Sequence, residues 1–248
     1  MAFQGPSGEL DDHAIGVKAR DGALAGEAHF VQAPVADAFI VAAHGTAGIE
    51  LHWVPRDASG LTIHAAALVD GSQSARLELR GVRADPIVAA PAGGLVLRDA
   101  IDHAAVATAA ELVGLMERAL ELTLDYLRTR KQFGKPIGSF QALQHRVVDL
   151  WIAKEMSRAA LNAAIARLND PQADAVSRSA AASGARARAA QSAFALCNQS
   201  IQLHGAIGFT DEYDLGLLVN RALALCAWPG DAQVHRRRFA SARAEVPA

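Results

Sequence analysis

The sequence predicts an α+β protein: a small antiparallel β-sandwich or barrel over residues 1–95, followed by an all-α helical bundle over residues 96–248. Three observations lead to this prediction. Most of the Pro and Gly residues and several short β-like runs lie in the first part of the chain. The segment Pro91-Ala92-Gly93-Gly94 then interrupts the pattern, and helical periodicity follows over nearly all of the remaining chain.

The β-like runs of the first part are short and are separated by turn residues. Residues 76–80 alternate polar and apolar side chains, as a half-buried antiparallel strand does. Further runs occupy residues 38–44, 49–54 and 61–68. Turn-forming residues occur at positions 57–60 and 70–72. Several strands joined by tight turns favour a compact sandwich or barrel.

The first helix is expected over residues 97–131, where apolar side chains form two neighbouring stripes. One stripe contains Leu112, Leu115 and Leu122, and the other contains Val113, Met116 and Leu120. A single stripe would suit a helix on a surface, whereas two stripes indicate burial on more than one side. Burial of this kind is typical of a helix in a bundle.

A second helix is expected over residues 140–168, with Ser139 as its N-cap because a hydroxyl can accept from the first-turn amides. Pro171 suits the first position of an Ala-rich third helix, since proline has no amide hydrogen to lose there. Gly205 is expected to end this third helix, because glycine adopts the left-handed conformation of a helix C-cap at little cost.

Two further helix starts are expected near the end of the chain. Thr210, Asp211 and Glu212 resemble the start of a fourth helix, where acidic side chains are favoured by the positive end of the helix dipole. After a break at residues 229–230, Asp231 can cap a last helix.

Composition excludes several classes of function. The net charge of -2 does not favour a nucleic-acid partner, and no segment is long and apolar enough for membrane insertion. No His pair has the spacing of a metal site, so we expect no metal. Cys197 and Cys226 lie in apolar surroundings, which indicates free buried thiols in a reducing compartment. Without a signal-peptide pattern at residues 1–10, the expected location is cytoplasmic.

Two segments resemble signatures of the acyl-CoA dehydrogenase family: residues 128–141, which read RTRKQFGKPIGSFQ, and residues 202–213, which read QLHGAIGFTDEY. The order and separation of the two segments also match the family. The resemblance implies a middle β domain followed by a four-helix-type bundle that binds FAD and mediates oligomerisation. It also implies that the family's N-terminal helical domain is absent from this chain.

The first segment contains groups suited to a dinucleotide. Arg130 carries a permanent planar cation that matches phosphate oxygens, Gln132 and Gln141 carry amides, and Phe133 offers a stacking face. The resemblance implies that these four residues reach the FAD of a neighbouring subunit. The alternative is a basic helix end that interacts with its own dipole, and this alternative is favoured for Arg128.

The second segment lies at the expected end of the third helix. The resemblance places Gln202, His204 and Gly205 against the adenosine-pyrophosphate part of FAD. Ala206 stands where the family usually has a second glycine, so a closer backbone approach is restricted. The alternative is a plain helix-ending turn between bundle helices, with His204 as a packing residue.

The reaction that the resemblance implies is α,β-dehydrogenation of an acyl-CoA thioester. A carboxylate removes the α proton while a hydride leaves the β-carbon for FAD. The usual Glu position is occupied here by Pro229, which cannot accept a proton. Asp231 is a weak candidate for a displaced base, and its alternative role is an N-cap. Asp102 matches a position near the pantetheine of the substrate.

These features leave three hypotheses open. The chain is a subunit of a homo- or hetero-oligomeric acyl-CoA dehydrogenase whose partner supplies the base. Alternatively, it is a self-sufficient enzyme whose first domain is encoded upstream. The third hypothesis is a catalytically inactive homologue that completes the FAD site of a partner or has a structural role. All three share the fold, because fold alone does not determine function.

Overall fold

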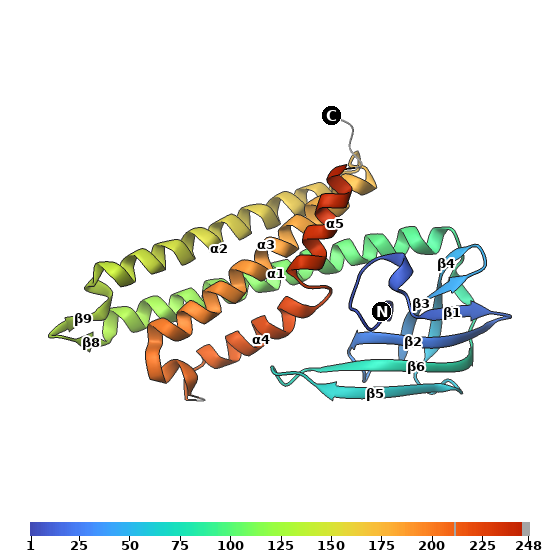
Figure 1. Ribbon diagram of the computed structural model, residues 1–248, viewed down its shortest axis with the longest axis horizontal. Coiled ribbons are helices and arrows are strands. Elements are labelled where there is room, and N and C mark those ends of the chain that lie inside the picture. Colours follow the sequence, from blue (N-terminus) through green and yellow to red (C-terminus); the bar gives the residue numbers. More distant parts are fainter. Residues whose placement is uncertain (211, 245–248) are drawn as a thin grey trace. The chain divides into compact units, whose positions relative to one another are not determined.

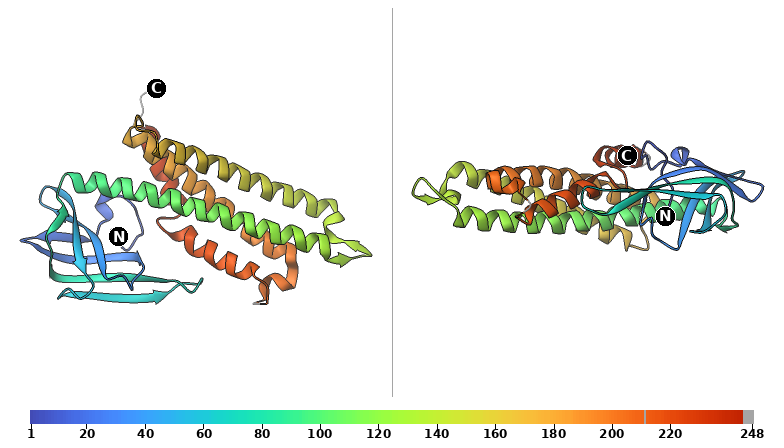
Figure 2. Two further views of the ribbon diagram at one scale, coloured as in Figure 1. Left: turned by 180° about the vertical axis from the view of Figure 1, so that it is seen from behind. Right: turned by 90° about the horizontal axis from the view of Figure 1, so that it is seen from below.

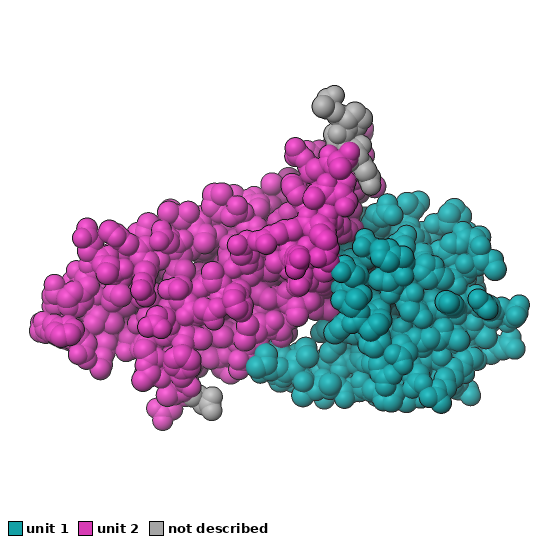
Figure 3. Space-filling view, in the orientation of Figure 1, with its two compact units in different colours: residues 1–101 teal, residues 102–248 magenta. Residues whose placement is uncertain are grey.

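The computed structural model describes residues 1–210 and 212–244, which form two compact units (Figure 3). The first unit comprises Met1–Ile101 and the second begins at Asp102. The division falls within helix α1, Ala92–Thr129, and the predicted boundary between residues 95 and 96 falls in the same helix.

The first unit is built on a seven-stranded sheet with the strand order β5-β6-β2-β1-β3-β4-β7 (Figure 1). All pairs are antiparallel except β1 with β3, which are parallel where Lys18 faces His44, so the sheet is mixed. Its strands are β1 Val17–Arg20, β2 Ala23–Gln32, β3 Ala38–Gly45, β4 Gly48–Pro55, β5 Leu61–Ala67, β6 Gln73–Arg83 and β7 Pro86–Val88.

Alternating side chains of these strands form the core of the first unit. The core contains β-branched and leucine side chains such as Val17, Leu24, Val41, Leu77 and Val82, which are less than 2 % exposed. The alternation of Leu77 and Leu79 with exposed or half-buried neighbours confirms the predicted half-buried strand. Burial of branched apolar side chains on one face of a sheet stabilises this unit.

The second unit is a bundle of long helices, as predicted for the second part of the chain (Figure 1). It contains the rest of α1, then α2 Gln141–Leu168, α3 Ala175–His204, α4 Leu215–Ala227 and α5 Ala232–Ala244. Helices α2 and α3 lie side by side in both views of Figure 2, and α4 and α5 also contact α3. The Ala-rich face of α3 allows this close approach of several helices.

The bundle core confirms that α1 is buried on more than one side. Leu112, Val113 and Met116 of α1 belong to one cluster with side chains of α2, α3 and α4. Both stripes of α1 contribute to it, since Leu112 and Val113 belong to different stripes. The predicted α+β fold class is therefore confirmed, with the sheet in the first unit and the helices in the second.

Three predicted helix ends differ from the structure or lie outside it. Ser139 does not cap α2, because a short 3-10 turn, Ile137–Ser139, precedes that helix and the Ser139 hydroxyl donates to the Pro136 carbonyl oxygen at 2.7 Å. Pro171 does not begin α3, which starts after its N-cap Asp174. Asp211 lies outside the described residues, and α4 begins at Leu215.

Within residues 1–210 and 212–244, no helix has the length and hydropathy needed to cross a bilayer. The same residues contain no group of three or more His, Cys, Asp or Glu side chains arranged to hold a metal ion.

Candidate functional site

A two-residue hairpin projects from one end of the bundle, immediately after α1 (Figure 1). Its strands are β8 Lys131–Gln132 and β9 Lys135–Pro136, joined by Phe133 and Gly134. Both turn residues have positive φ, 54° for Phe133 and 78° for Gly134. This is the geometry of a type I′ turn, which glycine adopts easily and a phenylalanine rarely does.

The Phe133 ring stands at the outer end of this hairpin and is 91% exposed. It meets the ring of Phe140 edge-on, with 6.1 Å between centroids, and the Lys135 ammonium lies 4.4 Å from the centroid of Phe140. An apolar ring of this size is seldom left in water, whereas a flat exposed ring is suited to stacking on another flat group. The hairpin thus presents a stacking face outward.

Arg130 connects α1 to the hairpin, and its backbone is fixed on both sides. Its amide donates to the Tyr126 carbonyl oxygen at 2.8 Å, and its own carbonyl oxygen accepts from the Ile137 amide at 2.8 Å. Its guanidinium is exposed and, within the described part of the chain, has no ion-pair partner. A fixed backbone with a free guanidinium suits the binding of an anionic ligand.

Gln132 and Gln141 accompany Arg130 at the same end of the bundle. Gln132 lies in β8, Gln141 begins α2, and both side chains are exposed. The Gly138 backbone packs closely on α1, since a Cβ at this position would lie 2.9 Å from the Leu127 carbonyl oxygen. This contact holds the start of α2 beside the end of α1.

The end of α3 carries the second predicted segment. Gly205 follows the last residue of α3 with φ 67°, as predicted for the C-cap, and its amide donates to the Ile201 carbonyl oxygen. Gln202 is exposed, whereas the His204 side chain is 3% exposed. The imidazole of His204 therefore points into the bundle, while the neighbouring backbone and Gln202 face outward.

Ring contacts bring the two predicted segments together. The His204 imidazole stacks on the Tyr126 ring with centroids 4.6 Å apart, and Tyr126 lies one helical turn before Arg130. The Tyr213 ring lies 5.0 Å from the imidazole and 6.5 Å from the Tyr126 ring, measured between centroids. The hairpin after α1 and the turn after α3 are thus parts of one end of the bundle, although they are far apart in sequence.

The His204 imidazole is in a defined state. Its Nδ1 lies 2.7 Å from the Ser200 carbonyl oxygen, so Nδ1 carries a hydrogen and donates it. Burial lowers the pKa of His204 below its ordinary value, which keeps the ring neutral at physiological pH. Its Nε2 is buried and has no hydrogen-bond partner within the described residues.

The loop before α5 is held tightly. The Oδ1 atom of Asp231 accepts from the Gln233 and Val234 amides, both at 2.8 Å, which confirms the predicted N-cap of α5. A catalytic role for Asp231 as a displaced base remains a prediction. Pro229, at the usual Glu position, accepts from Nε2 of the fully buried His235 through its carbonyl oxygen at 2.7 Å.

Arg186 of α3 lies beneath this loop, and the sequence alone did not single it out. The residue is fully buried, and its Nη2 lies within hydrogen-bonding distance of the carbonyl oxygens of Leu225, Trp228 and Gly230. Burial lowers its pKa to about 10, so it keeps its charge at neutral pH. The signal for it in the sequence is an arginine with small side chains on both sides in an Ala-rich helix.

Asp102 occupies a buried polar cluster within the second unit. One carboxylate oxygen accepts from Arg238 at 2.5 Å and the other from the Ser179 hydroxyl at 2.6 Å. Arg238 also donates to the Ser183 hydroxyl at 3.2 Å. Both oxygens of Asp102 are therefore used inside the bundle, and its proposed contact with pantetheine stays a prediction.

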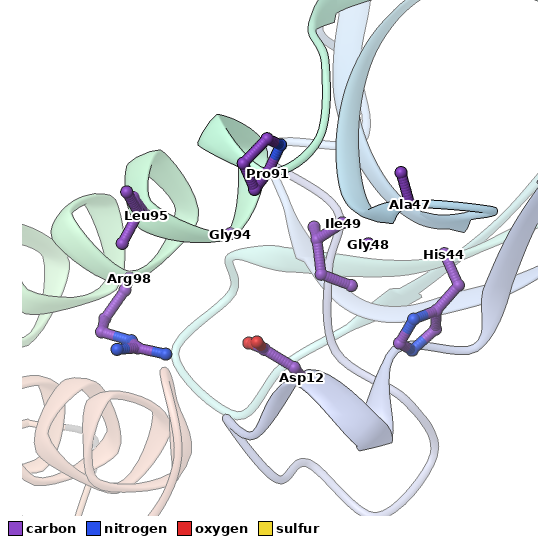
Figure 4. Close-up of a pocket in the computed structure, with 9 residues that line it drawn as sticks. All are labelled: Asp12, His44, Ala47, Gly48, Ile49, Pro91, Gly94, Leu95 and Arg98. Carbon is purple, nitrogen blue, oxygen red and sulfur yellow. The ribbon is translucent and has the colours of Figure 1, made fainter.

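The first unit contains a pocket of its own that sequence reasoning missed (Figure 4). Its volume is about 320 Å³, which lies near the lower end of the range of ligand sites. Apolar side chains such as Ile49 and Leu95 line it together with three ionisable groups, those of Asp12, His44 and Arg98. Groups of both charge signs could orient a small polar ligand there.

The residues at the hairpin end of the bundle fit a dinucleotide such as FAD. Four of the predicted residues, Arg130, Gln132, Phe133 and Gln141, are exposed in the segment between the end of α1 and the start of α2. Within residues 1–210 and 212–244, the Arg130 guanidinium and the side-chain amides of Gln132 and Gln141 make no hydrogen bond to protein. Such groups can donate to a pyrophosphate and stack on a ring without first breaking an internal contact.

Comparison with known proteins finds similarity to acyl-CoA dehydrogenases. The family model described as "Acyl-CoA dehydrogenase, C-terminal domain" matches residues 92–243. Acyl-CoA dehydrogenase IpdE2 of Mycolicibacterium smegmatis is 40% identical over 138 residues, which cover 56% of this chain and 42% of the relative. Acyl-CoA dehydrogenase FadE27 of Mycobacterium tuberculosis is 29% identical over 224 residues, covering 87% of this chain and 58% of the relative.

Solved structures with the same fold include assemblies of two different chains. The ChsE4-ChsE5 complex from Mycobacterium tuberculosis matches with a TM-score of 0.87 and 27% identity, covering 100% of this chain and 66% of that chain. The Tcur3481-Tcur3483 steroid ACAD G363A variant matches with a TM-score of 0.83 and 28% identity, covering 92% and 62%. The chain spans about half the length of the curated relatives it matches.

Proposed function

Because this chain belongs to the acyl-CoA dehydrogenase family, we propose that it is an FAD-binding subunit of an enzyme that dehydrogenates an acyl-CoA thioester between its α- and β-carbons. The observation that carries the proposal is the exposed set of unpaired groups at the hairpin end of the bundle, above all the Arg130 guanidinium. Its partner is a second copy or a different acyl-CoA dehydrogenase subunit.

Each predicted residue has a distinct part in holding FAD. Arg130 donates through its planar guanidinium to the pyrophosphate, since two parallel N–H groups match two phosphate oxygens. Gln132 and Gln141 donate through their side-chain amides, and the Phe133 ring stacks on a flat ring of the nucleotide. FAD, when bound, supplies the acceptor for the hydride that leaves the β-carbon of the substrate.

The turn after α3 contributes a second surface to the same site. Gln202 is exposed there, and the backbone around His204 and Gly205 lies at the bundle end. We assign these residues to the adenosine-pyrophosphate side of FAD. The positive φ of Gly205 turns the chain away from the axis of α3, so that backbone and ligand can approach.

Removal of the α proton requires a base that this chain does not offer at the usual position. Pro229 has no ionisable group, and the Asp231 carboxylate is used as the N-cap of α5. Loss of a general base costs about a hundred- to ten-thousand-fold in rate. We therefore assign the base to a partner subunit of different sequence, because a second copy of this chain would carry the same Pro229, and we assign this chain to binding FAD and holding the acyl-CoA in place.

A second candidate function also follows from Pro229, which has no ionisable group at the usual position of the base. A homologue without a base can complete the FAD site of its partner while taking no part in proton transfer. This alternative predicts that the partner alone lacks FAD and that the mixture contains it. It differs from the first proposal because no substitution in this chain would then alter the rate of proton abstraction once FAD is bound.

The experiment that tests the proposal compares two arginines two residues apart. Arg130→Ala should remove most of the FAD from the purified assembly, measured by flavin absorbance per mole of protein. Arg128→Ala is the matched control, because Arg128 is exposed and pairs with Asp125 at 3.4 Å. Equal FAD content in the two variants and the parent would contradict the assignment of Arg130.

A further inference from the structure

Contacts of the His204 ring with two tyrosine rings link the two halves of the proposed FAD site. Tyr126 lies on α1 with its ring plane 25° from that of the imidazole, and the Tyr213 ring is tilted by 52° from the imidazole. Tyr126 and Tyr213 also meet edge-on, with centroids 6.5 Å apart. The three rings therefore form one aromatic cluster, which we call the ring joint.

The imidazole is enclosed by the protein and leaves no room for a ligand. His204 is 3% exposed, its ring stacks on Tyr126 and meets Tyr213 at a tilt, and Nδ1 donates to the Ser200 carbonyl oxygen. The remaining polar atom, Nε2, is buried as well. A side chain enclosed in this way acts on a bound nucleotide through its neighbours rather than by contact.

Tyr126 connects the ring joint directly to Arg130. The Tyr126 carbonyl oxygen accepts from the Arg130 amide at 2.8 Å, and Arg130 follows the last residue of α1. The Tyr213 hydroxyl lies 3.5 Å from the Leu122 carbonyl oxygen, one turn earlier on α1. The ring joint thus fixes the last turns of α1, from which Arg130 and the hairpin extend.

We propose that His204 is a positioning residue whose ring, packed against Tyr126 and Tyr213, sets the place of Arg130, and that its nitrogen atoms make no contact with FAD. The expected effect of His204 on FAD binding rests on the proposed function. The expected effect of His204 on the order of residues 130–137 does not depend on any cofactor. A ring of similar shape should replace the imidazole, whereas a methyl group should not.

The test uses two substitutions at one position in the full chain. His204→Phe keeps a flat ring against the tyrosines and removes both nitrogens, and His204→Ala removes the ring. Amide hydrogen exchange of the peptide spanning residues 130–137 is measured without FAD at low temperature, with circular dichroism as the check of folding. We expect at least tenfold faster exchange in His204→Ala and exchange within about threefold of the parent in His204→Phe.

The FAD affinity of the assembled protein is measured in parallel by flavin fluorescence. We expect about tenfold weaker binding in His204→Ala and little change in His204→Phe, because stacked aromatic pairs are worth a change of this order. Equal loss in both variants would show that the imidazole itself contacts FAD and would overturn the inference.

Failure of the inference and failure of the proposed function are distinguishable. If the parent assembly takes up no FAD, the proposed function fails, and the exchange measurement still decides the role of His204. If His204→Ala leaves the exchange of residues 130–137 unchanged, the inference fails whatever the FAD result. If His204→Ala does not fold, the amide exchange of residues 130–137 in His204→Phe tests the inference alone. Exchange that is clearly faster than in the parent would then overturn it.

Discussion

The Arg186 guanidinium of α3 donates to the Leu225 carbonyl oxygen near the end of α4, with Nη2 and the oxygen 2.6 Å apart. The same nitrogen reaches two carbonyl oxygens of the following loop, and the Arg186 side chain is fully buried. Carbonyl groups at a helix C-terminus have no partner within their own helix, and a cation there also suits the helix dipole. Arg186 therefore fixes the connection between α4 and α5.

Arg186→Ala should lower the free energy of unfolding by about 2–4 kcal/mol, because charged hydrogen bonds are lost and buried carbonyl groups are left unpaired. Arg188→Ala is the matched control on the same helix, since Arg188 is exposed. Urea unfolding followed by circular dichroism measures both. Equal stability of the two variants would contradict the role of Arg186.

Asp231 can be tested separately as a cap and as a base. Asn caps a helix about as well as Asp but cannot accept a proton in catalysis, so Asp231→Asn should retain both stability and turnover of the assembled enzyme. Asp231→Ala should lose about 1 kcal/mol of stability. Steady-state turnover with an acyl-CoA and an electron acceptor checks this, and a hundredfold loss in Asp231→Asn would assign the base to Asp231 after all.

Buried His235 should make the protein less stable in mild acid. Burial, with the Arg186 charge nearby, lowers the pKa of His235 to about 3, whereas an unfolded histidine titrates near 6.5. The unfolded state therefore binds more protons below pH 6.5, and stability falls as the pH drops towards 3. The slope from one such group approaches about 1.4 kcal/mol per pH unit.

This pH dependence can be measured by urea unfolding between pH 7 and pH 5, above the range in which most carboxylates titrate. His235→Gln should flatten the curve, because an amide can still donate to the Pro229 carbonyl oxygen without titrating. Identical slopes in the parent and the variant would show that His235 is not the responsible group.

Phe133 has a positive φ of 54° at a turn position where other residues are less strained. Asn followed by Gly is the preferred pair for a type I′ turn, so Phe133→Asn should leave thermal stability unchanged or higher. The same change removes the exposed ring and should weaken FAD binding about three- to tenfold. A variant with unchanged FAD affinity, measured by flavin fluorescence, would show that the ring has no part in the site.

An exposed apolar row on α2 leads us to expect an oligomer. Val148, Trp151, Ile152 and Met156 recur at helical spacing and are each about half exposed. A contiguous apolar patch is typical of a protein interface. Trp151→Glu should shift the assembly towards smaller species in light scattering, whereas Arg146→Glu, at an exposed position on another side of the same helix, should not. A parent chain that is monomeric alone and with its partner subunit would contradict this expectation.

Local signals in the sequence predicted much of the fold. Gly205 and Asp231 end and begin helices as predicted, because the capping groups act within a few residues of their own position. Ser139 fails as a cap because a 3-10 turn that the residue pattern does not reveal captures its hydroxyl. The conformations of such short turns depend on packing as well as on propensity.

The candidate site was predictable as a set of residue types, whereas its internal contacts were not. The exposed groups of the segment that contains Arg130 follow from the resemblance, and the structure places them at one end of the bundle with the turn at Gly205. The pairs Tyr126–His204 and Asp102–Arg238 join residues distant in sequence. Helical periodicity describes one element at a time, so it cannot reveal which helices meet.

The most direct measurement is an experimental structure of the assembled protein with FAD. We expect the Arg130 guanidinium to lie within hydrogen-bonding distance, about 2.7–3.2 Å, of pyrophosphate oxygens, with the Phe133 ring beside the nucleotide. A structure in which FAD is bound elsewhere while Arg130 faces solvent would contradict it.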